Sequence, residues 1–355
     1  MNINCNILKA FNGDCIWINF KDEAGETRNI LVDGGPGNAY QFKNRKGKQE
    51  AGDLQNLISR LRNKDQFIDL LILTHVDDDH IGGLLKWFKK DREAKNLIKK
   101  VWFNSGRLIS EYFGEENTEE NDLSLGDATG FDTSIRQGVN FEEFLQENVL
   151  WERRLIHSSN ELKIFGFKLT FVSPDINKLK NLLVKWEKES PITETSGKDD
   201  YGWSLEKHIQ EDVFKEDTSI HNGSSIGFIL EYNGKSAVFL GDAHPTQVAN
   251  TLRSLGYSKK APLEAEFLKV SHHGSKANTS YELLELIDTH SYIISSNGDK
   301  HQLPDKQCLA RIINHNSKAK IYFNYPEKIP VIFKDEDYDA FPDFQALSAE
   351  NGFTL

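Results

Sequence analysis

Stretches in which apolar and polar residues alternate fill the first third of the chain, and segments with apolar residues at helical spacing lie between them. Alternation predicts strands with one buried face, and recurrence every three or four residues predicts amphipathic helices. The predicted strands are residues 3–11, 15–20, 28–32, 70–73 and 101–103. The first two are predicted to form a β-hairpin around the turn Asn12-Gly13-Asp14. The predicted helices are residues 53–63, with Asp53 as the N-cap, and about 80–90. Strands followed by a strand–helix–strand unit are typical of an α/β sandwich.

The second half of the chain continues with strand–helix units. Two strands are expected around Gly166 within residues 162–172, and the turn formers Asn233-Gly234 predict a hairpin over residues 225–240. The units predicted after this hairpin are residues 267–271 with 279–288, residues 292–296 with 304–314, and a terminal strand pair at 320–334.

Two segments interrupt this pattern, and we interpret them as insertions. Residues 105–152 are acidic, whereas residues 187–220 are polar and predict a long loop with at most one short helix, near 205–214. Loops of this length in compact domains are usually either functional or disordered. Both segments suit a lid over a pocket for a small molecule.

Composition narrows the class of protein. The 355 residues are 38% hydrophobic and 27% charged, which suits a soluble globular protein with a sizeable core. No apolar run approaches the roughly 20 residues that span a bilayer, and the first residues lack the pattern of a signal peptide. Cys5, Cys15 and Cys308 are odd in number and widely spaced, so we expect no disulfide framework and predict a cytoplasmic location.

The net charge of −11 works against loose binding to nucleic acid, because affinity for phosphates normally depends on clustered lysine and arginine. A nucleic-acid substrate is still compatible with the sequence. Metal ions in a cleft, together with Lys269, Lys276 and Lys300, could reverse the potential locally. Large basic patches are absent from the sequence, which makes a tightly bound polymer less attractive as a substrate.

Residues 74–83, Thr-His-Val-Asp-Asp-Asp-His-Ile-Gly-Gly, contain the most informative chemistry. They place two imidazoles and three carboxylates directly after a buried apolar run, where so many ionisable groups would be costly without a counter-charge. A divalent metal supplies that charge. We expect Asp78 to point away, while the side chains that can converge on a metal are His75, Asp77, Asp79 and His80. A solvated acidic N-cap is the plainer alternative, but it does not explain the histidines.

Three further strand ends have the same form. An apolar run leads into Asp33-Gly34-Gly35, another into Gly241-Asp242, and a third into His272-His273-Gly274-Ser275. A scaffold that brings these strand ends to one rim would gather the acidic and imidazole groups in a single cleft. Taken alone, Asp33 and Asp242 are equally compatible with ordinary turn aspartates.

These motifs, in this order, resemble the metallo-β-lactamase-fold hydrolases, whose hallmark is H-x-H-x-D-H followed by distant Asp and His ligands. The resemblance covers most of residues 1–335. It implies an α/β fold, a four-layer αββα sandwich of the metallo-β-lactamase type, as one hydrolase domain over residues 1–335 with the two insertions. Residues 336–355 would then be a C-terminal tail.

Asp77 stands where the second histidine of that hallmark usually lies. The version H-x-D-x-D-H, together with His272-His273-Gly274-Ser275, resembles the hydrolase domain of the ComEC-type DNA-uptake channel proteins and related soluble hydrolases. His221-Asn222 occupies the approximate place of the superfamily's third-motif histidine, so either residue is a candidate metal or substrate contact. The resemblance favours His272 as a metal ligand, and it implies that His273 orients a ligand or contacts the substrate.

The resemblance also implies two divalent metal ions, with zinc expected and manganese a real competitor because Asp77 puts oxygen where the hallmark has an imidazole nitrogen. Asp242 would bridge them, and Asp33 would accept a hydrogen bond that orients a ligand histidine. Asp79 would bind metal and also accept a proton. His301 would contact a substrate phosphate or protonate the leaving group, although an exposed loop histidine is the alternative.

The predicted reaction is hydrolysis by a metal-bridged hydroxide, with a phosphodiesterase or nuclease as the favoured type of enzyme. The fold hosts many activities, so this choice rests on analogy. One alternative is a hydrolase of a small ester, amide or cyclic nucleotide, and another is a non-catalytic member of the fold that binds a partner. Five convergent ligands argue against the non-catalytic alternative.

Overall fold

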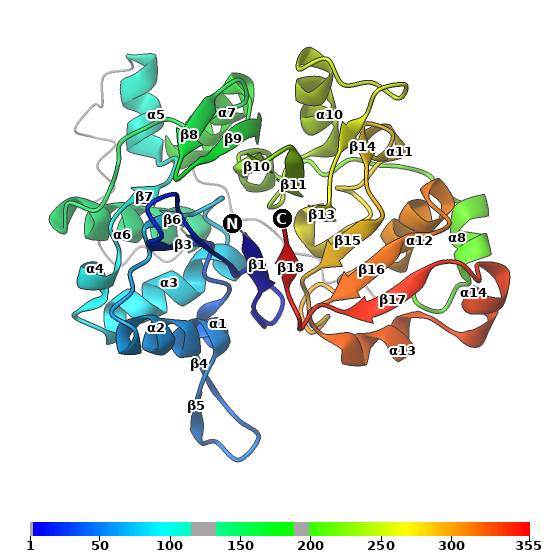
Figure 1. Ribbon diagram of the computed structural model, residues 1–355, viewed down its shortest axis with the longest axis horizontal. Coiled ribbons are helices and arrows are strands. Elements are labelled where there is room, and N and C mark those ends of the chain that lie inside the picture. Colours follow the sequence, from blue (N-terminus) through cyan, green and yellow to red (C-terminus); the bar gives the residue numbers. More distant parts are fainter. Residues whose placement is uncertain (1–2, 115–132, 188–198) are drawn as a thin grey trace.

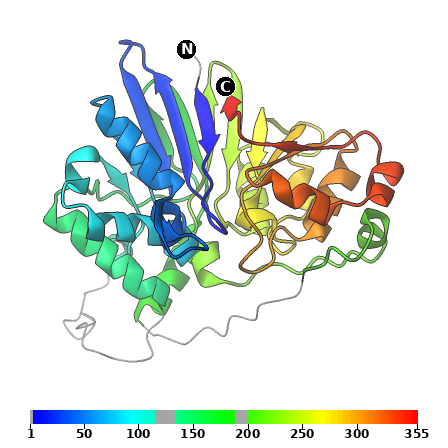
Figure 2. The same ribbon diagram turned by 90° about the horizontal axis from the view of Figure 1, so that it is seen from below.

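A computed structural model describes residues 3–114, 133–187 and 199–355 of the chain. Two large sheets lie face to face, and helices cover the outer face of each (Figures 1 and 2). Three hydrophobic cores fill the layers: one between the sheets, one between the first sheet and its helices, and one between the second sheet and its helices. The predicted αββα sandwich is therefore present.

The first sheet has six strands in the order β18-β1-β2-β3-β6-β7. Their bounds in chain order are β1 Asn4–Ile7, β2 Ile16–Lys21, β3 Thr27–Val32, β6 Leu70–Ile72, β7 Val101–Trp102 and β18 Phe353–Thr354. The predicted hairpin is the antiparallel pair β1–β2, and β3 pairs with β6 in parallel. Parallel pairing brings the carboxyl ends of β3 and β6, and the loops after them, to the same edge.

The second sheet has eight strands in the order β17-β16-β15-β13-β11-β10-β9-β8. Their bounds in chain order are β8 Glu161–Ile164, β9 Phe167–Ser173, β10 Gly227–Tyr232, β11 Lys235–Phe239, β13 Phe267–Lys269, β15 Ser291–Ile294, β16 Lys320–Phe323 and β17 Gln345–Ser348. The predicted hairpin about Asn233-Gly234 is β10–β11. Because β11, β13 and β15 run parallel, the segments that follow them also share one edge.

Helices and short elements complete the layers. In the first half they are α1 Gly37–Tyr40, β4 Gln41–Lys43, β5 Gln49–Ala51, α2 Asp53–Asn63, α3 Asp78–Lys90, α4 Ala94–Leu97, α5 Gly106–Phe113, α6 Thr133–Glu147 and α7 Ile176–Glu187. In the second half they are α8 Leu205–Gln210, α9 Ile220–Gly223, α10 Pro245–Ser254, β12 Leu263–Glu264, η2 Ser271–Gly274, α11 Tyr281–Leu284, β14 Ile287–Asp288, α12 Lys306–His315, η3 Pro326–Lys328, α13 Ile329–Ile332 and α14 Asp335–Ala340.

Three predicted boundaries are wrong. The N-cap of α2 is Gly52 rather than Asp53, whose carboxylate instead accepts a hydrogen bond from the backbone N–H of Lys9 at 2.9 Å. Helix α3 begins at Asp78, two residues earlier than expected, because Asp77 takes the extended N-cap conformation. The helix predicted over residues 279–288 is only the four-residue α11, since the chain turns into β14.

The C-terminal part differs most from the expectation. Residues 320–334 form one strand, β16, and not a pair, because Pro326 and Pro330 open the helical turns η3 and α13. Residues 336–355, expected to be a tail, instead supply strands to both large sheets. β17 pairs with β16 in the second sheet, and β18 pairs with β1 in the first.

Parts of both expected insertions are structured. Helix α6 packs on α3, with the rings of Phe88 and Phe144 stacked at 4.0 Å. The short helix predicted near 205–214 is α8, whereas α7 was not predicted. The remaining parts of the two insertions, residues 115–132 and 188–198, lie outside the described residues.

Two further expectations concern membranes and thiols. Among the helices of the described residues, none has the length and apolar content needed to cross a bilayer. Cys5, Cys15 and Cys308 are all buried free thiols.

Candidate metal centre

The predicted side chains meet where β6, β11 and β13 end, between the two sheets. Three groups of residues each offer ligand atoms that lie within 4.8 Å of one another. The groups are His75 with His80 and Asp242, Asp79 with His80 and His273, and Asp14 with Asp242 and His273. Asp242 and two histidines are shared between groups, so the three form one continuous cluster.

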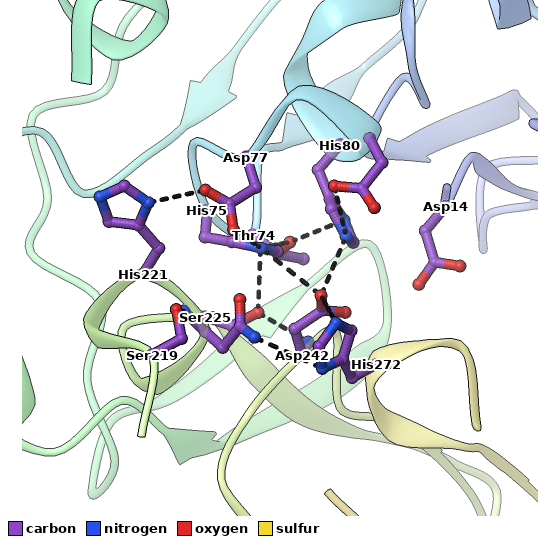
Figure 3. Close-up of polar contacts among 12 residues, drawn as sticks. Asp14, Thr74, His75, Asp77, His80, Ser219, His221, Ser225, Asp242 and His272 are labelled. Atoms are coloured by element: carbon purple, nitrogen blue, oxygen red, sulfur yellow. Dashed lines mark hydrogen bonds and ion pairs between the residues drawn. The ribbon is translucent and has the colours of Figure 1, made fainter. Parts of the chain in front are cut away.

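Asp242 lies at the centre of this cluster, with only 2% of its side chain exposed. Its Oδ2 atom lies 3.6 Å from Nε2 of His75, 3.4 Å from Nε2 of His80 and 3.7 Å from Nε2 of His272. Its Oδ1 atom lies 3.8 Å from Nε2 of His273. Figure 3 shows His75, His80 and His272 gathered around this carboxylate.

A buried network fixes His75 and His80 from behind. Asp33 lies at a left-handed φ of 58° at the end of β3, and its Oδ2 lies 2.8 Å from Nδ1 of His80. The hydroxyl of Thr74 donates to the same carboxylate at 2.8 Å and lies 3.0 Å from Nδ1 of His75. With Nδ1 engaged on each ring, Nε2 is directed into the cluster.

His273 is fixed in a similar way. Its Nδ1 lies 3.0 Å from the backbone oxygen of Ser295 and 3.3 Å from Oδ1 of Asp14. Its Nε2 lies 3.5 Å from Oδ2 of Asp79. Asp14 is in turn bonded to the fully buried amine of Lys269 at 2.8 Å. The sequence suggested that Lys269 adds positive charge to the cleft, but this ion pair neutralises it.

Several atoms of the cluster are buried without a hydrogen-bond partner. They include Nε2 of His75, His80 and His273, and Oδ1 of Asp242. Buried polar atoms are nearly always satisfied, so each exception calls for a physical reason. Three imidazole nitrogens that converge on one carboxylate while their other nitrogens are engaged have the arrangement of metal ligands. The residues present therefore fit a divalent cation.

The electrostatics of the cluster are strongly coupled. Burial alone would raise the pKa of Asp242, but the facing histidines, His80 first, hold it well below its usual value. Burial opposes protonation of His80, yet Asp242 and Asp33 raise its pKa well above the usual range. Burial and the charge of His80 lower the pKa of His75. The histidines thus favour the ionised form of the Asp242 carboxylate at the centre of the cluster.

Asp77 and His221 form the opposite edge of the cluster. Oδ2 of Asp77 lies 3.7 Å from Nε2 of His75, and its Oδ1 lies 2.7 Å from Nδ1 of His221. Although burial raises the pKa of Asp77, the hydrogen bond from His221 lowers it to about 2. Asn222 donates to Asp217 at 2.7 Å and lies 3.4 Å from Nδ1 of His272.

The geometry distinguishes the two adjacent histidines and favours His273, rather than the expected His272, as a candidate ligand. His273 is 1% exposed and belongs to two of the three ligand groups, whereas the side chain of His272 is 25% exposed and belongs to none of those formed by the described residues. A continued strand would turn the two adjacent side chains to opposite sides. Both residues instead take left-handed φ values, 47° and 55°, which turn the pair within η2.

His301 lies apart from the ligand groups. It follows β15 in a turn at residues 301–302, with a left-handed φ of 61°, and it belongs to none of the three groups found among residues 3–114, 133–187 and 199–355. Asp78 behaves as expected, because it is exposed and accepts a hydrogen bond from Gln137 at 2.8 Å.

Sequence reasoning missed Asp14 and Asp217. The sequence predicts only a turn at Asp14, but Gly13 beside it packs so closely on Asp79 that a Cβ there would collide with the carbonyl oxygen of Asp79. The pairing of glycine with a buried carboxylate was the available signal. Asp217 lies in the second insertion, 3.6 Å from Nδ1 of His272, and no motif marks it.

An αββα sandwich with a His/Asp cluster at its strand ends defines a class of metal-binding protein. Comparison with known families identifies the family to which this chain belongs. The sequence model of the Metallo-beta-lactamase superfamily matches residues 8–296, so this chain belongs to that superfamily. Members of the superfamily are generally metal-dependent hydrolases.

Individual relatives are distant. ComE operon protein 3 of Bacillus subtilis (strain 168) is 22% identical over 348 residues, which are 94% of this chain and 34% of that protein. The chain thus spans about a third of that relative's length. Similar solved structures include the metallo-beta-lactamase fold protein YhfI of Bacillus subtilis (11% identity, TM-score 0.40, 100% of this chain and 98% of the other). Another is Zn²⁺-bound PqqB of Methylobacterium extorquens (12% identity, TM-score 0.40, 100% and 99%).

Proposed function

We propose that this protein is a phosphodiesterase or nuclease that works with two divalent cations. The observation that carries the proposal is the convergence of the buried Nε2 atoms of His75, His80 and His273 on Asp242, without hydrogen-bond partners. Such a cluster is costly unless positive charge is added. Cytoplasmic location stays a prediction from the cysteine content.

One cation site would be held by His75, Asp77 and Asp242. The second would be held by Asp79, His80 and His273, with Asp242 shared between the two. Imidazole and carboxylate donors suit zinc, and the carboxylate of Asp77 in place of the usual second histidine keeps manganese as the competitor. When bound, two such cations activate water, polarise the electrophile and stabilise the charge that develops during hydrolysis.

The chain's own residues then have separate tasks. Asp33 and Thr74 hold His80 and His75 in the tautomer that keeps Nε2 available. His272, more exposed than the other rings and 3.7 Å from Asp242, would contact the substrate at the mouth of the cluster. His221 and Asn222 would orient Asp77 and His272. A substrate contact of His301 stays a prediction from the sequence alone.

The choice of a phosphodiester rests on the H-x-D-x-D-H and His272-His273-Gly274-Ser275 motifs, whose resemblance favours a placement with the ComEC-like subgroup. The similarity to ComE operon protein 3 extends over 94% of this chain and is consistent with that placement. A small ester, amide or cyclic nucleotide is the alternative substrate.

The direct test is metal content combined with hydrolysis of bis-p-nitrophenyl phosphate. We expect up to two zinc or manganese ions per chain by elemental analysis, turnover that a chelator abolishes, and recovery when either metal is returned. Metal without phosphodiester cleavage, but with cleavage of p-nitrophenyl acetate, would favour the small-ester alternative. Neither metal nor turnover would favour a non-catalytic partner-binding member.

The orienting role of Asp33 gives a second prediction. Asp33→Asn replaces one oxygen of the carboxylate that contacts His80 and Thr74 with an amide nitrogen. We therefore expect metal affinity, measured by competition with a chromophoric chelator, to fall by about 10–100-fold. Asp22→Asn is the matched control, because Asp22 lies at the opposite end of β3 and pairs with Arg28 at 2.7 Å. Equal metal affinity in the two variants would remove Asp33 from this role.

A further inference from the structure

A short hairpin, residues 41–51, projects from the body of the protein beside α1 (Figure 1). Its strands β4 and β5 pair only with each other in a two-stranded sheet. The turn is ordered by Asn44, whose Oδ1 accepts from the backbone N–H groups of Lys46 at 2.9 Å and Lys48 at 3.0 Å. No motif had assigned a function to this segment, which we call the basic arm.

The arm concentrates positive charge on an acidic protein. Four cations lie within six residues, and all four are exposed: Lys43, Arg45, Lys46 and Lys48. None of them forms an ion pair with another residue of the described chain. Glu50, the one acidic residue of the arm, is hydrogen-bonded to Asn44 at 2.6 Å. The net charge of the whole chain is −11, so this concentration is local.

The base of the arm is fixed to the rim of the metal centre. Phe42 packs edge-on against Phe11, with ring centroids 5.4 Å apart. Asn12, the residue after Phe11, has its Nδ2 atom 3.4 Å from Oδ2 of Asp79. On the other side Lys86 of α3 donates to the backbone oxygen of Gln41 at 2.6 Å. Helix α3 begins within the metal-motif segment, so both anchors connect the arm to residues of the candidate centre.

Two of the lysines that the sequence suggested for the cleft are paired with carboxylates. Lys269 pairs with Asp14 at 2.8 Å, and Lys276 pairs with Asp305 at 3.3 Å. The arm, whose four cations form no ion pair within the described chain, is placed to meet an anion that extends beyond the centre. Its tip lies roughly 10 Å past Phe42, at about 3.3 Å per residue. A single small phosphodiester in the centre cannot span that distance, whereas a polynucleotide carries phosphates along its whole length.

We propose that the basic arm binds the phosphate backbone of a polynucleotide whose scissile phosphodiester occupies the metal centre. This inference rests on the proposed hydrolase function for cleavage, but the binding itself is independent of it. Lysine and arginine contacts to phosphates are insensitive to sequence and depend steeply on salt. The arm thus favours a long nucleic acid over a cyclic nucleotide or a small ester as the substrate.

The test compares two four-fold variants of the full chain with equal charge changes. Lys43→Gln, Arg45→Gln, Lys46→Gln and Lys48→Gln neutralise the arm. The control variant also loses three lysines and one arginine, but from other exposed positions that form no ion pair within the described chain. Its substitutions are Lys89→Gln, Lys90→Gln, Arg92→Gln and Lys95→Gln. Binding of a fluorescent oligothymidylate of about 30 nucleotides is followed by anisotropy over a range of salt concentrations.

We expect the arm variant to bind at least about ten-fold more weakly at low salt, and its slope of log affinity against log salt to be smaller by about two to three. The control set should change both by much less. Lys43→Arg, Lys46→Arg and Lys48→Arg together keep the charge and should keep the affinity, which separates charge from folding of the arm. Equal losses in the arm and control variants would overturn the proposal.

Two further readouts separate this inference from the proposed function. Hydrolysis of bis-p-nitrophenyl phosphate should be unchanged in the arm variant, because that substrate does not reach the arm, while cleavage of the long oligonucleotide falls. If the wild type cleaves the small diester but the arm variant binds and cleaves the oligonucleotide normally, only the arm proposal fails. If the arm affects binding to phosphatidylserine vesicles and not to DNA, its partner is a lipid surface and the proposal also fails.

Discussion

Asp242→Ala should abolish measurable hydrolysis of a phosphodiester, a loss of more than about a thousand-fold. Its carboxylate is the one group of the cluster that faces His75, His80, His272 and His273 together, at 3.4–3.8 Å. Removing it leaves these imidazoles without their shared counter-charge and, in our proposal, removes a ligand of both cations. Turnover of bis-p-nitrophenyl phosphate and elemental analysis measure the two effects separately.

The matched control is Asp78→Ala. Asp78 belongs to the same motif but is exposed and bonded to Gln137, away from the cluster. Its loss should cost only the stabilisation of an acidic residue in the first turn of α3, about 0.3–1 kcal/mol, with metal content unchanged. If Asp242→Ala keeps turnover within about ten-fold of the wild type, or if Asp78→Ala loses as much, Asp242 does not bridge a pair of cations.

The core of the candidate centre could be predicted because its motifs follow apolar strands. His75 and Asp242 come at the ends of buried apolar runs that are visible in the sequence, and His80 lies five residues after His75 in the same motif. Parallel pairing of β11 with β13 and of β3 with β6 then brings these ends to one edge. The fold class follows from the same pattern.

What could not be predicted depends on local backbone conformation and long-range pairing. The choice between His272 and His273 depends on two successive left-handed residues, which no periodicity reveals. Lys269 looked like a cation of the cleft, because nothing in the sequence says that Asp14, 255 positions away, is its partner. The strands β17 and β18 were missed because short, polar segments become strands only when the sheet edges are present to pair with them.

The second large effect concerns stability. Asp337→Ala should lower the free energy of unfolding by about 3–5 kcal/mol, because it leaves the fully buried amine of Lys306 without its counter-charge. The two groups are 2.6 Å apart and neither side chain is exposed. Asp337 also accepts from the backbone N–H groups of Leu205 and Lys334, both at 2.8 Å, so it connects α8 and α14 to α12. Urea unfolding followed by circular dichroism measures the change.

Asp339→Ala is the control, since Asp339 is exposed on the same helix and should change stability by less than about 0.5 kcal/mol.

Combining Lys306→Met with Asp337→Asn separates the charge from the hydrogen bonds. The pair of substitutions leaves no uncompensated charge, and the asparagine oxygen can still accept from Leu205, so the double variant should be more stable than Asp337→Ala. A double variant as unstable as Asp337→Ala would mean that the backbone hydrogen bonds, rather than the ion pair, hold α8 and α14 on α12. An Asp337→Ala protein as stable as the Asp339→Ala control would show that this buried contact contributes nothing to the fold.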